Sequence, residues 1–192
     1  MEWLTWALVV LTVLLAVAWY LSYSASRLDR LHARFEGALS ALDAHLVRRA
    51  EATLELANSG VLDPASALLL AAAASESLER TTARAGEDLL EGQHFGGREV
   101  VESDLTEALM LAASPDLLDH LHEHGGPAVD AWARVEASGR RVQLARRFHN
   151  DAVKDVQRVR AKPVVRLFRL AGHADLPQTV EFDDDLPTPV RT

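Results

Sequence analysis

Residues 3–23 read WLTWALVVLTVLLAVAWYLSY, a run of twenty-one residues without a charged side chain. As an α-helix this run is about 30 Å long, which is the thickness of the hydrocarbon core of a bilayer. Aromatic rings favour the two membrane interfaces, and here they stand near both ends of the run. These aromatic residues are Trp3, Trp6, Trp19, Tyr20 and Tyr23. The sequence therefore predicts a transmembrane anchor over residues 1–24.

A cleaved secretory signal is the alternative interpretation of this stretch, because Ala16-Val17-Ala18 has the small-x-small form of a cleavage site. The residues before the apolar run are Met1 and Glu2, so no basic side chain precedes it. No small polar region leads up to the triplet either. We therefore expect the stretch to be retained as an anchor.

The charges beside the apolar run predict its orientation. Arg27, Arg30 and Arg34 follow it, whereas Glu2 is the only charged side chain before it. Basic residues near a span stay on the cytoplasmic side. We expect a single-pass protein of the cell membrane with its N-terminus outside and the remainder in the cytoplasm.

The residues after the anchor have the pattern of long helices. Apolar side chains recur in steps of three and four over 27–59, which predicts that the first helix continues out of the membrane. This stripe contains Leu28, Leu31, Phe35, Ala38 and Leu42. Residues 58–60 (Asn-Ser-Gly) are expected to end the helix. Asp63 and Pro64 then form the cap and first position of a second helix, which extends to about residue 85.

Residues 86–101 contain four glycines and no apolar period, so they are predicted to form a loop. Ser103 or Asp104 is the expected cap of a third helix. That helix should break or kink at residues 114–115 (Ser-Pro) and resume as far as His124.

The last long helix is predicted over residues 128–161. Its apolar seam repeats every seven residues, as in helical bundles. The seam contains Val135, Val142, His149 and Val156, with Trp132, Ala152 and Val159 between them. No β-branched alternation typical of strands occurs after the anchor. The predicted fold is all-α, with one transmembrane helix followed by an antiparallel bundle of about four long helices.

Three segments follow from this interpretation: the anchor 1–24, the bundle 25–171, and an acidic, proline-containing, flexible tail 172–192. Charge is unevenly divided along the bundle. Residues 51–139 carry a balance of -13, from seventeen acidic and four basic side chains. Residues 140–170 carry +8, from ten basic and two acidic side chains. Packing of the basic helix against acidic helices explains most of this division.

Residues 163–170 interleave apolar side chains with arginine, which is the composition of a short interfacial helix. Arg166, Phe168 and Arg169 are its candidate lipid contacts. The acidic-aromatic segment 181–185 is interpreted as part of a solvated tail, with docking to a partner as the alternative.

The sharpest chemical motif is His120-Leu-His-Glu-His124, which fits the inverted zincin pattern H-x-x-E-H. His120 and His124 lie one helical turn apart and could share a metal ion. The helix ends at Gly125, however, and no context for a third ligand accompanies it. A solvated helix end is the simpler interpretation, so no metal site is predicted.

Other chemistries are poorly supported. The chain has no cysteine, which excludes thiol catalysis and cysteine-ligated metals. It has no phosphate-binding loop, and its acidic overall charge of -8 argues against nucleic acid as a partner. His45 and His149 lie on apolar stripes and are interpreted as a buried polar layer. We expect no cofactor and no small-molecule substrate.

Residues 35–49 read FEGALSALDAHLVRR, and residues 145–153 read ARRFHNDAV. Together with the anchor, these stretches resemble the LemA family of membrane-tethered helical proteins. The residues that carry the resemblance are Asp43, Arg48, Arg49, Arg146 and Asn150. His45 replaces the family's usual glutamine, and residues 51–56 depart from the segment that commonly follows the arginine pair. The resemblance implies an N-terminal membrane helix, an antiparallel helical bundle and no established catalytic residues.

We therefore expect a membrane-anchored, non-enzymatic scaffold or interaction protein, with the bilayer and an unidentified protein as its partners. The acidic face of the second and third helices is the expected partner surface. The alternatives are an accessory factor of a membrane protease or envelope-stress system, and a metal-dependent hydrolase that uses His120 and His124. A contact between Asp43 and either Arg146 or Asn150 is also expected, if the first and last long helices are neighbours.

Overall fold

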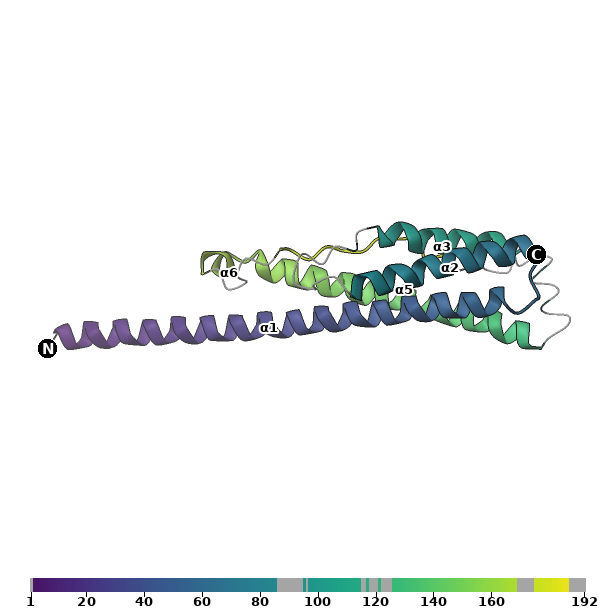
Figure 1. Ribbon diagram of the computed structural model, residues 1–192. Helices are drawn as coiled ribbons and strands as arrows, with labels where there is room; N and C mark the ends of the chain where they lie inside the picture. The colour runs from purple at the N-terminus through teal and green to yellow at the C-terminus, as the bar shows by residue number, and fades with distance from the viewer. Residues whose placement is uncertain are drawn as a thin grey trace.

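The computed structural model describes residues 2–85, 95, 97–114, 117, 121, 126–168 and 175–186. Its regular elements are all helices, and no strand occurs within these ranges. The helices are α1 (Glu2–Ala57), α2 (Pro64–Ala85), α3 (Arg98–Ala112), α5 (Pro127–Arg160) and α6 (Pro163–Leu167) (Figure 1). The prediction of an all-α protein is confirmed for the described part of the chain.

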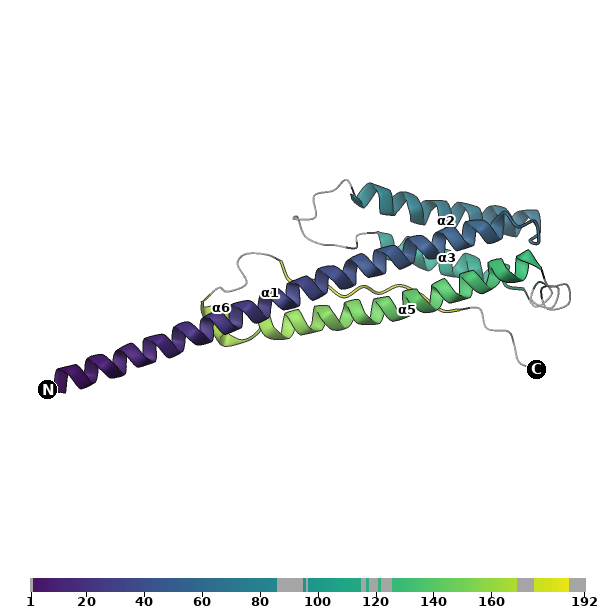
Figure 2. The ribbon, with the colours of Figure 1, turned by 90° about the horizontal axis from the view of Figure 1, so that it is seen from below.

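Helix α1 is one uninterrupted helix of 56 residues, about 84 Å long at the usual rise per residue. Residues 2–20 are all exposed, whereas the second half buries side chains every three or four residues. The apolar half extends beyond the other helices (Figures 1 and 2). Continuation of the helix through residues 27–57 is confirmed, as is its end before residues 58–60.

Asp63 caps α2 as the sequence predicted. Its Oδ1 atom accepts hydrogen bonds from the backbone N–H groups of Ala65 (3.0 Å) and Ser66 (3.1 Å), so two otherwise unpaired donors of the first turn are satisfied. Gly60 has a φ of 74°, a conformation that glycine adopts without strain, in the turn that precedes this cap. The chain reverses there, and α2 packs against α1 and α3.

Helix α3 begins at Arg98, so the expectation of a loop to residue 101 and a cap at Ser103 or Asp104 was wrong. Gly97 has a φ of 74° and precedes the first turn, and the Arg98 N–H donates to the Phe95 carbonyl (2.9 Å). The side chains of Arg98 and Glu102 are buried against α1 and α2, which favours helix where the local pattern favoured a loop.

The end of α3 at Ala112 agrees with the break expected at residues 114–115. Leu117 and Leu121 are buried in the core beyond it. The other residues of the expected continuation to His124 lie outside the described part of the chain.

Helix α5 confirms the last long helix within one residue at each end. Its seam residues are no more than 2% exposed, and α5 runs back along α1 over most of its length (Figures 1 and 2). Those seam residues are Val135, Val142, His149 and Val156. Trp132, Ala152 and Val159 are buried as well, so the seven-residue repeat identified the buried face correctly.

Two large cores, and a small one of Leu28, Val159 and Val165, hold the described helices together. The distal core joins all four long helices and includes Leu56, Leu70, Leu105 and Val135. The proximal core lies nearer the apolar half of α1 and includes Phe35, Phe95, Val142, Val153 and Phe182. The first core depends on the α2–α3 hairpin, whereas the second is completed by chain that follows α6.

Residues 175–186, called the strap below, are extended and run along α5 toward the distal end of the protein (Figure 2). Val180 is 2% exposed, Phe182 7% and Asp184 9%, so the interpretation of this segment as a solvated tail was wrong. Side chains of an extended chain alternate between two sides, which buries Val180 and Phe182 and leaves Glu181 exposed.

Candidate functional site

A group of polar and charged residues, most of them buried, joins α1, α2 and α3. The carboxylate of Glu102 is completely buried and binds Arg49 Nη2 at 2.6 Å and Arg98 Nε at 3.3 Å. Its Oε1 atom also accepts from the Ser77 hydroxyl at 2.8 Å. Arg98 Nη1 extends the group to Asp43 at 2.8 Å. These five residues are called the inner cluster.

The two guanidinium groups of the inner cluster form further bonds, although Arg49 Nε is buried without a hydrogen-bond partner among the described residues. Arg49 Nη1 donates to the Thr106 hydroxyl at 3.0 Å, and Arg49 Nη2 also donates to the Glu102 carbonyl at 2.9 Å. Arg98 Nη2 donates to the Thr81 hydroxyl at 2.8 Å. A buried ion is tolerated only when partners replace its lost hydration, so each member of the cluster requires the others. The arrangement fixes how three helices meet.

A second group of polar residues binds the strap to α5. Arg146 forms a bidentate pair with Asp184, with Nε–Oδ2 at 2.7 Å and Nη2–Oδ1 at 3.0 Å, and its Nη1 lies 3.2 Å from Glu181. The hydrogen bonds that Arg146 donates to Asp184 raise the pKa of Arg146 above its ordinary value, although partial burial acts in the opposite direction. This arginine therefore remains a cation and holds two strap carboxylates.

Asn150 binds the strap backbone with both ends of its amide. Its Nδ2 donates to the Val180 carbonyl (3.0 Å), and its Oδ1 accepts from the Val180 N–H (2.9 Å). The next buried strap residue, Phe182, has the Arg49 guanidinium 5.9 Å and the Arg146 guanidinium 5.5 Å from its ring centroid. Phe182 therefore connects the inner cluster with the strap contacts through two cation–π interactions.

Four of the five residues that carry the expected LemA resemblance take part in these two groups of contacts. Asp43 and Arg49 belong to the inner cluster, whereas Arg146 and Asn150 bind the strap. Arg48 is exposed, and its positive charge contributes to the lowered pKa of His45. The expected contact between Asp43 and Arg146 or Asn150 is replaced by pairs with Arg98, Asp184 and Val180, because α3 and the strap supply nearer partners.

Sequence reasoning missed Arg98, Glu102 and the strap. Arg98 and Glu102 are one helical turn apart and opposite in charge, and they share a face with Val101, Leu105 and Leu109. The strap carries alternating apolar and acidic side chains at residues 180–183. Both sequence patterns are short. Neither indicates burial until the position of the neighbouring helices is known.

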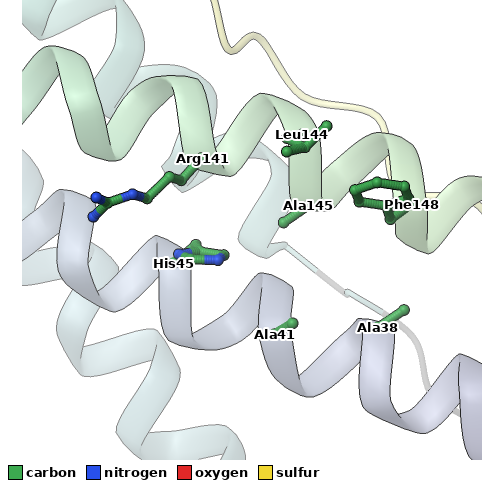
Figure 3. A pocket seen from close by; sticks show the side chains of 7 residues that line it. All are labelled: Ala38, Ala41, His45, Arg141, Leu144, Ala145 and Phe148. Atoms are coloured by element: carbon green, nitrogen blue, oxygen red, sulfur yellow. The ribbon is translucent and has the colours of Figure 1, made fainter.

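A groove between α1 and α5 lies on another face of the pair and is shown in Figure 3. It has a volume of about 160 Å³ and is lined by Ala38, Ala41, His45, Arg141, Leu144, Ala145 and Phe148. Burial lowers the pKa of His45, and the positive charges of Arg48 and Arg141 lower it further. Leu144 and Phe148 are more than half exposed, so the groove is open and largely apolar.

The two histidines interpreted as one polar layer have different surroundings. His149 is 2% exposed, and its ring centroid lies 5.4 Å from that of Phe35 and 6.5 Å from that of Phe95. His45 is half-buried at the groove between α1 and α5. The first is a core residue and the second borders solvent.

The residues expected at the membrane are exposed. Helix α1 is long and apolar enough to cross a bilayer, and no residue of its most apolar window is buried. Exposed side chains along it include Trp3, Trp6, Trp19, Tyr20, Tyr23, Arg27 and Arg30. In α6 and the turn after it, Arg166 and Phe168 are exposed, and Arg169 lies outside the described residues. This arrangement provides an uncovered apolar rod that ends at a basic segment.

The residues of the zincin-like motif, His120 and His124, also lie outside the described part of the chain. Within the part that the structure describes, no three histidine, aspartate or glutamate side chains are grouped so that they could hold a metal ion. No protein-family model matches the chain, and no curated protein or solved structure matches it either.

Proposed function

We propose that the protein is a membrane-anchored, non-enzymatic helical scaffold that presents interaction surfaces next to the bilayer. The observation that carries this proposal is the continuity of α1. The helix passes without interruption from a half with no protein cover, residues 2–20, into a half that forms the core of the bundle. The proposed anchor and the scaffold therefore share one continuous helix.

The exposed half of α1 supports a membrane environment on energetic grounds. Soluble monomers rarely expose contiguous apolar patches of more than a few hundred Å². Here the large apolar side chains of residues 3–20 are all more than 40% exposed, and Trp3 and Trp19 are 70% and 72% exposed at opposite ends. A bilayer would cover this surface and accommodate the rings at its interfaces.

Helix α6 supports a membrane contact at the base of the bundle. Its Val165 packs against Leu28 and Val159, so α6 lies beside α1 a few residues beyond the apolar run. Arg166, Leu167 and Phe168 are exposed there. At that height the arginine would meet headgroups while the apolar side chains enter the interface. The proposed orientation in the cell membrane places the N-terminus outside and the bundle in the cytoplasm.

The proposal includes the antiparallel arrangement of about four long helices and divergent membership of the LemA family. The contacts of Asp43, Arg49, Arg146 and Asn150 support that membership, because four of the five residues that carry the resemblance have specific partners. A protein partner is included, whereas a cofactor, a small-molecule substrate and nucleic acid are not.

Alkaline extraction of membranes tests the anchor. The full chain should stay in the membrane pellet, whereas Leu11→Arg combined with Leu14→Arg should move it to the supernatant, because each arginine at a helix centre disfavours insertion by about 2.5–3.5 kcal/mol. The matched control is Leu68→Arg with Leu111→Arg, two exposed leucines of the bundle. Extraction of the unmodified chain would refute the anchor.

Single-cysteine labelling tests the orientation, because the chain contains no cysteine of its own. A membrane-impermeant maleimide should label Glu2→Cys in intact cells. It should label Ser75→Cys, an exposed position on α2, only after the membrane is permeabilised. The reverse pattern would refute the proposed orientation and leave the anchor itself intact.

A further inference from the structure

The backbone of the strap is bound from both sides. Val180 is bound by Asn150 of α5, and the Asp184 carbonyl accepts from Gln143 of α5 at 2.6 Å. On the other side, Glu181 N–H donates to Glu99 of α3 at 2.6 Å. Successive residues of an extended chain direct their backbone groups to opposite sides. The strap thus lies in a groove whose two walls are α3 and α5.

Asp183 completes the contacts on the α3 wall. Its N–H donates to the Ser103 hydroxyl at 3.0 Å, and its carbonyl accepts from the Thr106 hydroxyl at 2.6 Å. Residues 181 and 183 are therefore held by α3, whereas residues 180 and 184 are held by α5. This alternation is the hydrogen-bonding pattern of an added strand, although side chains of two helices provide it.

The amides of α5 form a ladder with a spacing of seven residues. Gln143, Asn150 and Gln157 bind the strap backbone, and Gln157 Nε2 donates to the Pro177 carbonyl at 2.8 Å. Seven residues of helix span about 10.5 Å, and three or four residues of extended chain span about 10–13 Å. The ladder matches the repeat of an extended peptide whatever its sequence.

Side-chain contacts add a sequence preference at three positions. Val180 enters the proximal core, the Phe182 ring lies near two guanidinium groups, and Asp184 pairs with Arg146 through two bonds. The preferred pattern is apolar, any residue, aromatic, any residue, aspartate. An acidic residue at the second position gains a further contact with Arg146 and Asn150, as Glu181 does.

Gly139 provides space for the end of the strap. It lies inside α5, where glycine is less favourable than alanine by roughly 0.5–1 kcal/mol. A Cβ atom at this position would overlap the side chain of Leu186. Gly139 therefore leaves room for the Leu186 side chain at the distal end of the strap.

We propose that the groove between α3 and α5 is a binding site for an extended acidic-aromatic peptide segment of a partner protein, which binds in place of the strap. The site is the partner surface of the scaffold proposed above and so rests on that function. The strap occupies this site and competes with the partner segment. Because the strap is part of the same chain, its effective concentration at the site is high, and only a segment with a higher affinity displaces it. A strap from a second copy makes the same contacts without that advantage.

The probe is a fluorescent peptide of residues 175–186, DLPQTVEFDDDL, added to the full chain in detergent micelles and followed by anisotropy. The receptor is the full chain with Phe182→Ala and Asp184→Ala, which weakens its own strap and leaves the groove unchanged. This receptor should bind the peptide. The unmodified chain should bind it with an affinity at least about tenfold lower, because its own strap occupies the groove.

Two matched controls identify the groove as the site. Arg146→Ala in the weakened-strap chain should reduce peptide affinity by about tenfold to a hundredfold, through loss of charge-assisted bonds. Arg147→Ala, at the exposed neighbouring position, should leave affinity unchanged. A peptide that carries the same two alanine substitutions should not bind, which tests the contacts without altering the protein.

The proposal is overturned if the weakened-strap chain does not bind the peptide, or if Arg146→Ala leaves binding unchanged. It is also overturned if that chain ignores the free peptide but forms dimers with the unmodified chain by light scattering, because exchange of straps between copies then explains the groove. None of these results depends on membrane extraction, so the anchor and the peptide site can fail separately.

Discussion

The inner cluster and the strap contacts are both centred on arginine, yet they differ in burial and in what they connect. Arg49 and Glu102 have side chains that are 3% and 0% exposed and join helices, whereas those of Arg146 and Asp184 are 21% and 10% exposed and join a helix to an extended segment. Loss of the first opens the bundle. Loss of the second releases a segment that no helix needs for its own hydrogen bonds.

The largest effect is expected for Glu102→Ala, which leaves two buried guanidinium groups without their shared carboxylate. Loss of one partner of a buried ion pair costs about 3–5 kcal/mol. Urea unfolding of the full chain in micelles, followed by circular dichroism, should show a correspondingly lower midpoint. Glu107→Ala is the control on the exposed face of α3, with an expected change within about 0.5 kcal/mol. Equal effects of the two substitutions would remove the distinction between the clusters.

The next effect is expected for Arg146→Ala, which removes the bonds to Asp184 and Glu181. Hydrogen bonds to charged groups contribute about 1.5–3 kcal/mol, and partial exposure places this site at the lower end. Hydrogen exchange should show faster exchange of the Val180, Glu181 and Asp183 amides, with helical content unchanged. A parallel loss of protection in α3 and α5 would mean that the strap is integral to the bundle.

Arg134 sharpens the comparison because its geometry matches that of Arg146 while its burial does not. It forms a bidentate pair with Glu55 at 2.9 and 2.6 Å, and both side chains are about half exposed. Exposed pairs contribute up to about 1 kcal/mol. Arg134→Ala should therefore lower the unfolding free energy less than Arg146→Ala does, and more at low salt than at high salt. A larger loss would show that bidentate geometry, rather than burial, determines the strength of these pairs.

The smallest effect is expected at His45 and appears as a pH dependence. Its pKa is lowered in the folded protein, so both states are neutral above the ordinary value of 6.5. As the pH falls below that value, the unfolded chain binds a proton first, and stability decreases until the folded-state pKa is passed. His45→Gln should reduce the difference in unfolding midpoint between pH 7.5 and pH 5. An unchanged difference would assign the acid sensitivity to other groups.

The helices that the sequence predicted well are those with strong local signals. A long uncharged apolar run, an aspartate before a proline, and a seven-residue apolar repeat identify α1, the start of α2 and the buried face of α5. Each signal acts within a few turns of its own helix and needs no knowledge of the neighbours. The same reasoning placed the start of α3 too late, because Arg98 is stabilised by Asp43, 55 residues away in sequence.

The sequence singled out several residues of the two clusters without indicating what they contact. Of the five residues quoted for the LemA resemblance, Asp43, Arg49, Arg146 and Asn150 have specific partners in the structure, and Arg48 is exposed. Their partners could not be inferred, because the sequence of an acidic segment does not distinguish a solvated carboxylate from one that is paired with an arginine. Asp184 was assigned to solvent for this reason, and only the position of α5 beside it reveals the pair.

The uninterrupted path of α1 fixes an angular relation between the apolar surface and the bundle. Each helical residue adds about 100° of rotation and 1.5 Å of rise. One residue inserted between Tyr23 and Arg27 would turn the groove of α3 and α5 by about 100° relative to the apolar half. Seven inserted residues would nearly restore the angle and move the groove about 10 Å along the axis. The direction in which the groove of α3 and α5 faces, and its distance from the apolar half of α1, can thus be varied separately by insertions.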